Sequence, residues 1–446
     1  MVKGFRKRIG SPSQPISKYI YIVVALFFLS ACSIQKAQKT LLQSASLKGA
    51  HVGIAVYNDS KQKWVDQYQS DHYFTPASNT KILATYVGLR YLGDSIPGWG
   101  VAENQDTLFL LPKGDPSFLH PDFLYQPILD LIRQTKKKVV VQYQNNADHF
   151  DVFGDGWAWN DYAEDYQPQR TRMPIYGNVV HFYNTNGTLQ TRPSYFFKGI
   201  VGMEAGYQKQ WTRKQIGNFF YTTDQKNTAK YFQVPFDANY YNANVPVSLL
   251  NDTLSTSIDI QNISYPILAT AHTIKTVPTD SLLKIMMRRS DNFFAEQVLL
   301  MSSEQALGKM DDGRFIDSVL KSDFADLPQK MRWADGSGLS RYNLNTPQNY
   351  VAILKKMQDQ FGEARVTNIF EKGGEGTLGS YYKNFPGELH AKTGSLGGQI
   401  ALSGFIFTQK KQKLYFSVLV SNHMSPSSAG VRKAVEAYLI EVAKRN

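Results

Sequence analysis

The sequence predicts an α/β protein of the α+β type, in which one antiparallel sheet is flanked by helices and interrupted by a largely β insertion. Three observations support this fold class. Strand-like runs lie near both ends of the chain, helical periodicity dominates the neighbouring segments, and the middle has a different composition. With 446 residues, of which 42% are hydrophobic, the chain can bury a large core in more than one domain.

The N-terminal segment has the pattern of a bacterial secretion signal. A basic stretch precedes Tyr19–Ala31, an uncharged apolar run that falls short of the ~20 residues of a membrane-spanning helix. The run leads into Leu29-Ser30-Ala31-Cys32, which resembles a lipobox. We therefore expect residues 1–31 to be a lipoprotein signal peptide and Cys32 to carry the lipid. The mature protein would lie on the periplasmic side of the cell envelope, anchored to a membrane.

Cys32 is the only cysteine in the chain. If it is lipidated, then disulfides, thiolate metal sites and a cysteine nucleophile are all excluded from the folded part. The alternative is an ordinary signal peptide, or a short anchor, followed by an incidental cysteine.

Of the net charge of +12, +5 comes from the first 31 positions, which hold five basic residues and no acid. The remaining excess is mild, and no nucleic-acid-binding motif accompanies it. We expect no nucleic-acid partner.

After the signal segment, residues 32–46 are polar and predict a tether. The first part of a folded domain follows at 47–97. It contains an apolar, β-branched strand at His51–Tyr57, a second strand near Trp64–Tyr68 that completes a hairpin, and an amphipathic helix at Lys81–Leu92.

Residues 98–270 predict a separate insertion, because they are rich in Tyr, Asn, Gln and Phe and contain short strand-like runs at Lys138–Tyr143 and Tyr195–Val201. The first domain then resumes at 271–446. Its expected elements are a pair of helical segments within Leu282–Met301, strands at Gln399–Phe407 and Leu414–Ser421, and a helix at Ala429–Lys444.

Ser-x-x-Lys spacing occurs six times, so the spacing alone identifies no site. The pairs are Ser33/Lys36, Ser60/Lys63, Ser78/Lys81, Ser281/Lys284, Ser318/Lys321 and Ser380/Lys383. Only Ser78 directly precedes a long helix, where free backbone N–H groups favour developing negative charge. Lys81 follows one helical turn later, so its amine is within reach of the Ser78 hydroxyl.

A neutral Lys81 amine can take the proton that Ser78 must lose to become a nucleophile. A free lysine titrates near roughly 10.4, so the site must lower this pKa by desolvation and by a second cation nearby. Without that help, the pair would be a helix N-cap serine followed by a surface lysine.

Two further motifs, each present once, supply that help. Ser290-Asp291-Asn292 lies in a break between helical segments, and Lys392-Thr393-Gly394 lies on the start of a strand. Singly they could be a helix-capping serine and a strand-entry lysine. Together, in the order Ser-x-x-Lys, Ser-Asp-Asn, Lys-Thr-Gly, they form the signature of penicillin-binding proteins and class A β-lactamases.

Further segments extend the resemblance to the class C low-molecular-mass penicillin-binding proteins, a serine D-alanyl-D-alanine carboxypeptidase/endopeptidase family. They are Thr75–Ser78, Lys113–Pro116, Trp157–Asp161 with Tyr176-Gly177 beyond it, Asp335–Arg341 and His390–Gly394. The resembled family carries extra domains in the gap of about 200 residues that separates Lys81 from Ser290 here. The resemblance implies a penicillin-binding, β-lactamase-like catalytic domain at 47–97 and 271–446.

The resemblance also implies the chemistry. The substrates would be peptide stems of peptidoglycan, the inhibitors would be β-lactams, and no metal or cofactor would take part. Ser78 would form the acyl-enzyme with Lys81 as proton acceptor. Ser290 would relay the proton to the leaving amine, and Asn292 would bind the backbone amide of the substrate.

The same resemblance assigns the binding residues. Lys392 and Thr393 would hold the terminal carboxylate, charge against charge. Gly394 would leave room for the substrate to lie beside the strand. The backbone N–H groups of Ser78 and Ser395 would hold the oxyanion.

The insertion bears on substrate preference. Asp161 is expected to pair with the free amine of a diamino acid at the third stem position, or else to cap a turn. Tyr162–Pro174 is longer and more polar than in the resembled family. Asp335–Arg341, in the catalytic domain, is expected to be a structural turn.

Two other functions remain open on these motifs, a β-lactamase-like acyl-hydrolase and a lipoprotein that binds peptidoglycan without catalysis. The first would release the penicilloyl group quickly, and the intact Ser78, Lys81, Asn292 and Lys392 argue against the second. The sequence does not separate carboxypeptidase from endopeptidase activity. A metal hydrolase is disfavoured, because no histidine falls in a His-Glu-x-x-His spacing.

Overall fold

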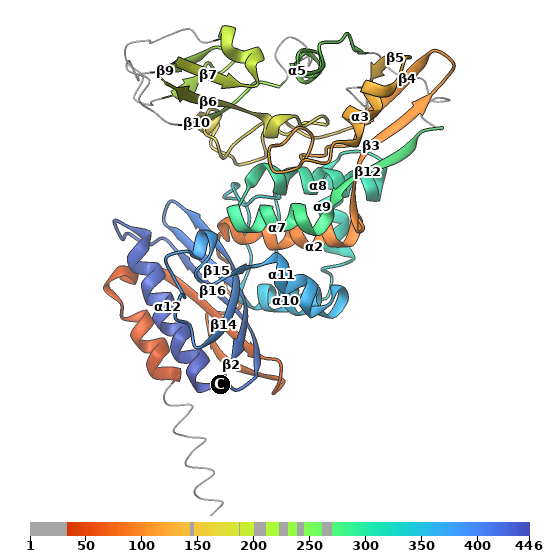
Figure 1. Cartoon of the computed structure of the whole chain (residues 1–446). Coiled ribbons are helices and arrows are strands. Elements are labelled where there is room, and N and C mark those ends of the chain that lie inside the picture. The colour runs from red at the N-terminus through yellow and green to blue at the C-terminus, as the bar shows by residue number, and fades with distance from the viewer. Residues whose placement is uncertain are drawn as a thin grey trace, which may run out of the picture.

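The computed structural model describes residues 34–142, 147–186, 188–199, 211–222, 231–238, 245–260 and 270–446. Figure 1 shows a body in which helices cover both faces of a sheet, with the insertion lying above one helical layer. The signal segment and Cys32 lie outside the described residues. In the part of the chain described, no helix is both long and apolar enough to cross a membrane.

The body is built on a six-stranded antiparallel sheet of order β13-β14-β15-β16-β1-β2. The strands are β1 (His51–Asn58), β2 (Lys63–Tyr68), β13 (Glu371–Lys372), β14 (Gly387–Leu396), β15 (Gln399–Thr408) and β16 (Lys413–Ser421). β1, from the N-terminal part of the chain, pairs with β16 from the C-terminal part, with Val56 opposite Phe416. The predicted α+β class with a helix-flanked antiparallel sheet is confirmed.

The sheet is apolar on both faces. In β16, Phe416 and Val418 pack with α12 (Ser428–Arg445), whereas Tyr415 and Leu419 pack with the helices of the opposite face. Successive side chains of a strand point to opposite faces, so a strand buried on both sides forms a nearly continuous apolar run. This is why the last strands could be predicted from the sequence.

The predicted tether at 32–46 is wrong for its described part, because residues 34–42 form a helix that lies beside α12 (Figure 1). Ala37 and Leu41, one turn apart, pack on the core between the sheet and α12. Asp66 on β2 accepts hydrogen bonds from this helix and from α12, both at 2.6 Å. Two apolar side chains in a polar run are a weak signal, so the sequence suggested a tether.

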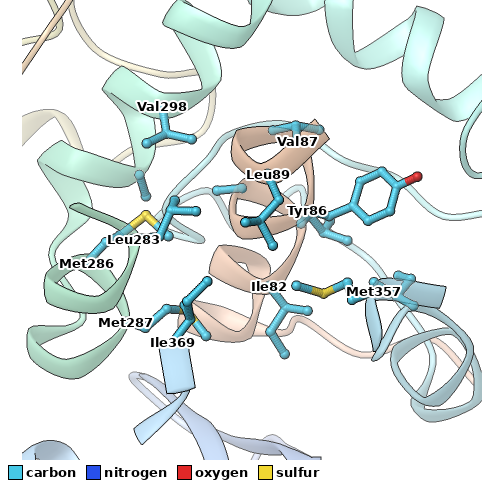
Figure 2. Close-up of a cluster of buried hydrophobic side chains, with 14 of the residues drawn as sticks. Ile82, Tyr86, Val87, Leu89, Leu283, Met286, Met287, Val298, Met357 and Ile369 are labelled. Atoms are coloured by element: carbon cyan, nitrogen blue, oxygen red, sulfur yellow. The ribbon is translucent and has the colours of Figure 1, made fainter. Parts of the chain in front are cut away.

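A layer of helices covers the other face of the sheet and surrounds α2 (Lys81–Tyr91). The surrounding helices are α7 (Thr279–Arg289), α8 (Asn292–Leu307), α9 (Asp312–Lys321), α10 (Pro347–Phe361) and α11 (Glu363–Ile369). Figure 2 shows α2 between Met286 and Val298 on one side and Met357 on the other. The helix is buried all round, not on one face as an amphipathic helix would be. This packing fixes the position of its first turn.

The insertion is larger than the predicted 98–270, because it begins with β3 (Ser95–Glu103) and ends with β12 (His272–Pro278). These two strands pair antiparallel, with Trp99 opposite Ile274. The connection between body and insertion is therefore a pair of strands and not a loop, which composition alone does not reveal.

Two small lobes make up the insertion. The first is a mixed sheet of order β11-β5-β4-β3-β12, and the second is a sheet of order β10-β6-β7 beside the β8/β9 pair. The other elements are β4 (Thr107–Pro112), α3 (Pro127–Gln134), β5 (Lys138–Val141), β6 (Val179–Thr185), β7 (Thr188–Arg192), β8 (Trp211–Arg213), β9 (Phe220–Thr222), β10 (Tyr231–Pro235), α5 (Val245–Leu254) and β11 (Asp259–Ile260).

The strand predicted at Tyr195–Val201 is instead a 3₁₀ helix, η5 (Ser194–Gly199), over its described part. Phe196 is buried against Phe220 and Phe236, whereas the aromatic residues on either side of it are exposed. This alternation imitates a half-buried strand, which explains the wrong prediction.

Candidate active site

Ser78 lies in a tight turn, η2 (Ala77–Thr80), at the N-terminus of α2. Ala77 has a φ of 47°, a left-handed conformation that non-glycine residues rarely adopt outside functional or strained sites. Gly338 packs so closely that a Cβ there would lie 1.9 Å from the Ala77 carbonyl oxygen. The Thr80 hydroxyl donates to the same carbonyl at 2.9 Å. The backbone before Ser78 is thus held from two sides.

Lys81 is completely buried, and its amine contacts three groups from three parts of the chain. Its Nζ lies 3.1 Å from the Ser78 Oγ, 2.5 Å from the Asn292 Oδ1 and 2.7 Å from the Ser337 carbonyl oxygen. The structure therefore places the predicted proton acceptor beside the predicted nucleophile.

Burial lowers the pKa of Lys81 to about 8, while the charges of Asp335, Asp291 and Glu296 act in the opposite direction. Burial therefore has the effect that the sequence assigned in part to a second cation. The pKa of Lys392 also lies well below its ordinary value, first because of burial and then because of the charge of Lys81. An amine with a pKa near 8 is partly neutral at physiological pH, so Lys81 can accept a proton.

The second motif forms the junction of two helices. α7 ends at Ser290, which is left-handed with a φ of 58°, and the Asp291 carboxylate caps α8 by accepting from the Phe294 N–H at 2.9 Å. The Ser290 Oγ accepts from the Lys392 Nζ at 2.9 Å. Asn292 contacts Lys81 through its oxygen and donates from its nitrogen to the Tyr166 carbonyl at 2.8 Å. Asp291 therefore caps the start of α8, and Ser290 occupies the C-terminal cap of α7.

The third motif lies on β14, which passes directly against the Ser78 turn. A Cβ on Gly394 would lie 2.7 Å from the Pro76 carbonyl oxygen and 3.1 Å from the Asn79 nitrogen, so only glycine fits there. The Thr393 hydroxyl pairs with the Thr377 hydroxyl at 2.7 Å.

Ser395, the last predicted residue on β14, brings a further charge to the site. Its hydroxyl accepts a hydrogen bond of 2.6 Å from the Arg432 guanidinium on α12. This end of β14 therefore brings the Lys392 amine and the Arg432 guanidinium to the site, and the guanidinium favours an anionic group of a ligand.

Asp161 lies in a short 3₁₀ turn, η3 (Trp159–Asp161), and reaches the site through one residue. Its carboxylate accepts from the Tyr166 hydroxyl at 2.8 Å, and the Tyr166 carbonyl is the group that Asn292 contacts. The structure thus places Asp161 at the edge of the site, without direct contact to Ser78 or Lys81.

The long polar run at 162–174 docks the insertion on the body. Arg170 lies 2.5 Å from Asp312 and 3.5 Å from Glu296, and Arg172 lies 2.8 Å from Glu304. Both arginines are buried. The polarity that distinguished this run in the sequence is therefore used in buried ion pairs between insertion and body.

A cavity of about 560 Å³ adjoins the second motif on the side of the insertion. Its lining combines Ser290 and Asn292 with Tyr166, His181 and Gln233 of the insertion. Space for part of a ligand is therefore present between the two parts of the chain, beside the second motif.

The structure adds two residues to the site that sequence reasoning missed. Ser337 contributes through its carbonyl, which no side-chain pattern reveals, so Asp335–Arg341 is part of the site as well as a turn. Glu296 supports Ser337 by accepting from its N–H at 2.7 Å. Its signal was available, because it is an acid one turn after Asn292, between the apolar runs 293–295 and 298–301.

Fold and site together define the class. A helix-flanked antiparallel sheet in which Ser-x-x-Lys, Ser-Asp-Asn and Lys-Thr-Gly motifs converge on one buried lysine is the arrangement of a penicillin-binding serine peptidase. The chain belongs to the D-Ala-D-Ala carboxypeptidase 3 (S13) family, whose model matches residues 34–196 and 217–442.

Similar proteins agree with this assignment. The penicillin-sensitive carboxypeptidase A of Dictyostelium discoideum is 22% identical over 452 residues, which cover 85% of each chain. The D-alanyl-D-alanine carboxypeptidase DacB of Haemophilus influenzae is 28% identical over 156 residues, 33% of this chain and 32% of that protein. The crystal structure of penicillin binding protein 4 from Haemophilus influenzae has a TM-score of 0.71 and 18% identity over 92% of this chain and 99% of that one.

Proposed function

We propose that this protein is a serine D-alanyl-D-alanine carboxypeptidase/endopeptidase that acts on peptidoglycan stem peptides through an acyl-enzyme on Ser78. β-Lactams would acylate the same serine. The observation that carries the proposal is the buried Lys81 amine, 3.1 Å from the Ser78 hydroxyl and with a pKa lowered to about 8. Membership of the S13 family and the similarity to a penicillin-sensitive carboxypeptidase support it.

In the acylation step, the Ser78 oxygen attacks the carbonyl carbon between the two D-alanines while its proton passes to the Lys81 amine. The bond to the departing nitrogen then breaks, and that nitrogen takes up a proton. Ser290 provides the path for this proton. Water hydrolyses the resulting ester and restores the Ser78 hydroxyl.

The binding residues hold the groups of the substrate that lie on either side of the scissile bond. Lys392, with Thr393 and Arg432 nearby, holds the terminal carboxylate. Gly394 lets the substrate lie beside β14, and the backbone N–H groups of Ser78 and Ser395 hold the oxyanion. Asn292 binds the backbone amide of the substrate, which requires its donor group to share or leave the Tyr166 carbonyl.

The test is a digest of purified muropeptides with the mature protein. Release of D-alanine from uncross-linked pentapeptides shows carboxypeptidase activity, and conversion of cross-linked dimers to monomers shows endopeptidase activity. A protein that is labelled by penicillin but cleaves neither substrate would contradict the proposed function.

We also propose that Asp161 selects the stem peptide by pairing with the free amine of a diamino acid at the third position. Its carboxylate lies at the edge of the site and is held by the Tyr166 hydroxyl. A charged hydrogen bond of this kind contributes about 1.5–3 kcal/mol when desolvated. Asp161→Asn is therefore expected to lower kcat/KM for diaminopimelate-type stem peptides by about 10–100-fold, with near-normal penicillin acylation.

Asp155→Asn, which changes an exposed acid of the same region, is the matched control and should alter neither reaction. Equal losses of turnover and acylation in Asp161→Asn would indicate a structural role. Unchanged kinetics in both reactions would remove Asp161 from the site.

We propose further that Cys32 carries a lipid that holds the protein on the periplasmic side of the cell envelope. The support is the apolar run that ends in the lipobox-like sequence. The helix at 34–42 begins two residues later and packs along α12, so a lipid on Cys32 would keep the body close to the membrane.

Cys32→Ser is expected to release a soluble protein or to leave an unprocessed precursor, in either case without lipid. The measurement is incorporation of labelled fatty acid, together with fractionation of the envelope. Tm should stay the same, because the substitution lies outside the described body, which begins at residue 34. Fatty acid incorporated into the Cys32→Ser protein would show that the lipobox assignment is wrong.

A further inference from the structure

Glu296 is a buried acid to which the proposed mechanism gives no role. It lies on α8 one turn after Asn292 and is 1% exposed, between the buried residues Ala295 and Gln297. An acid in such a place destabilises the fold unless it is paired and hydrogen-bonded. Its partners are therefore informative.

The partners of Glu296 lead to Lys81. Its Oε1 accepts from the Ser337 N–H at 2.7 Å, and the carbonyl oxygen of the same residue accepts from the Lys81 Nζ at 2.7 Å. On the other side, the Arg170 Nη1 lies 3.5 Å from the Glu296 Oε2. One residue thus separates the acid from the amine, and a cation from the insertion holds the far end of the acid.

We propose that Glu296 is a positioning residue for Lys81, because it anchors the Ser337 backbone whose carbonyl oxygen keeps the amine beside Ser78. The inference rests on the proposed function, since it takes Lys81 as the acceptor of the Ser78 proton. Glu296 does not touch the substrate and acts only through Ser337 and through its charge.

The charge of Glu296 also affects the pKa of Lys81. Burial, followed by the charge of Asp335, raises the pKa of Glu296 to about 7, while Arg170 acts in the opposite direction. Ionised Glu296 raises the pKa of Lys81, as do Asp335 and Asp291, and the charge of Lys81 in turn lowers the pKa of Lys392. Loss of the Glu296 proton near neutral pH therefore favours retention of the proton on Lys81.

The experiment measures the rate of penicillin acylation against pH in Glu296→Gln and Glu296→Ala. Glutamine keeps an acceptor for the Ser337 N–H but loses the charge. We expect a rate within about threefold of the wild type at high pH, with the acidic limb moved to lower pH by about half a unit or more. Alanine loses the acceptor too, so we expect at least a tenfold lower rate at every pH.

Gln297→Ala is the matched control. Gln297 is the next residue on α8, is equally buried, and bonds Gly114 and Thr171 of the insertion, but it makes no link to Lys81. We expect Gln297→Ala to have a lower Tm, with the acidic limb of its acylation pH profile at the same pH as in the wild type. A purely structural role for Glu296 predicts this same behaviour for Glu296→Gln.

An unmoved limb in Glu296→Gln, or wild-type acylation in Glu296→Ala, would overturn the inference. If neither variant folds, the wild type still tests it, because coupled titration of Glu296 and Lys81 broadens the rise of acylation with pH beyond that of a single group. A rise that fits one group would then count against the inference. Failure of the wild type to be labelled at Ser78 would instead refute the proposed function.

Discussion

Ser78→Ala is expected to abolish covalent labelling by a fluorescent penicillin and to reduce release of D-alanine by at least about a thousandfold. The reason is that alanine removes the oxygen that forms the acyl bond, while the turn that holds it stays. Among the Ser-x-x-Lys pairs that the structure describes in full, Ser78 is the one whose hydroxyl lies beside a completely buried amine. Mass spectrometry of the wild-type adduct should locate the penicilloyl group on the peptide that contains Ser78.

Ser318→Ala and Ser380→Ala provide matched controls, because both serines have the same spacing to a lysine and lie outside the site. Each should label like the wild type. Labelling that survives in Ser78→Ala would falsify the assignment of the nucleophile. The lifetime of the wild-type adduct separates the remaining alternative, since a β-lactamase-like acyl-hydrolase releases the penicilloyl group rapidly.

Lys81→Ala is expected to slow acylation by about 10²–10⁴-fold, the range that general-base catalysis contributes. The change removes the group that takes the Ser78 proton. Stopped-flow or gel-based acylation rates measure the effect. Lys284 is an exposed lysine of another Ser-x-x-Lys pair. Lys284→Ala is therefore the matched control and should leave the acylation rate unchanged.

The wild-type rate should also depend on pH in a direction set by Lys81. Below about 8 the amine is mostly protonated and cannot accept a proton, so acylation should rise as the pH increases through that value. The rise should be absent from the residual activity of Lys81→Ala. Equal acylation of the wild type at pH 6 and pH 9, or a pH-dependent rise retained in Lys81→Ala, would show that Lys81 is not the acceptor.

The residues of the candidate active site were predictable because short motifs specify them. Ser78 and Lys81 are one helical turn apart, and the order of the three motifs identified their class before any fold was known. The wrong predictions came from tertiary effects. Residues 34–42 are helical because α12 provides a surface to pack on. The insertion begins with β3 and ends with β12 because these two strands pair with each other.

Glu296 and Ser337 show a different limit of sequence reasoning. The contribution of Ser337 is a backbone carbonyl, which every residue possesses, so its position depends entirely on the fold around Asp335. That carboxylate accepts from the backbone N–H groups of Gly338 and Ser340 at 2.9 and 2.6 Å and from the Trp157 indole at 2.9 Å. The turn is shaped by contacts from distant parts of the chain, including the insertion.

The pairing of β3 with β12 affects how the sequence of this protein can evolve. Ser95 lies opposite Pro278, so the insertion leaves and rejoins the body at nearly the same point. Strand pairing already brings these ends together, and the entropy of closing a loop grows only slowly with its length. Residues can therefore be gained or lost in the outer lobes at little cost to the body. Such a chain can acquire new preferences for cell-wall peptides while its nucleophile keeps its place.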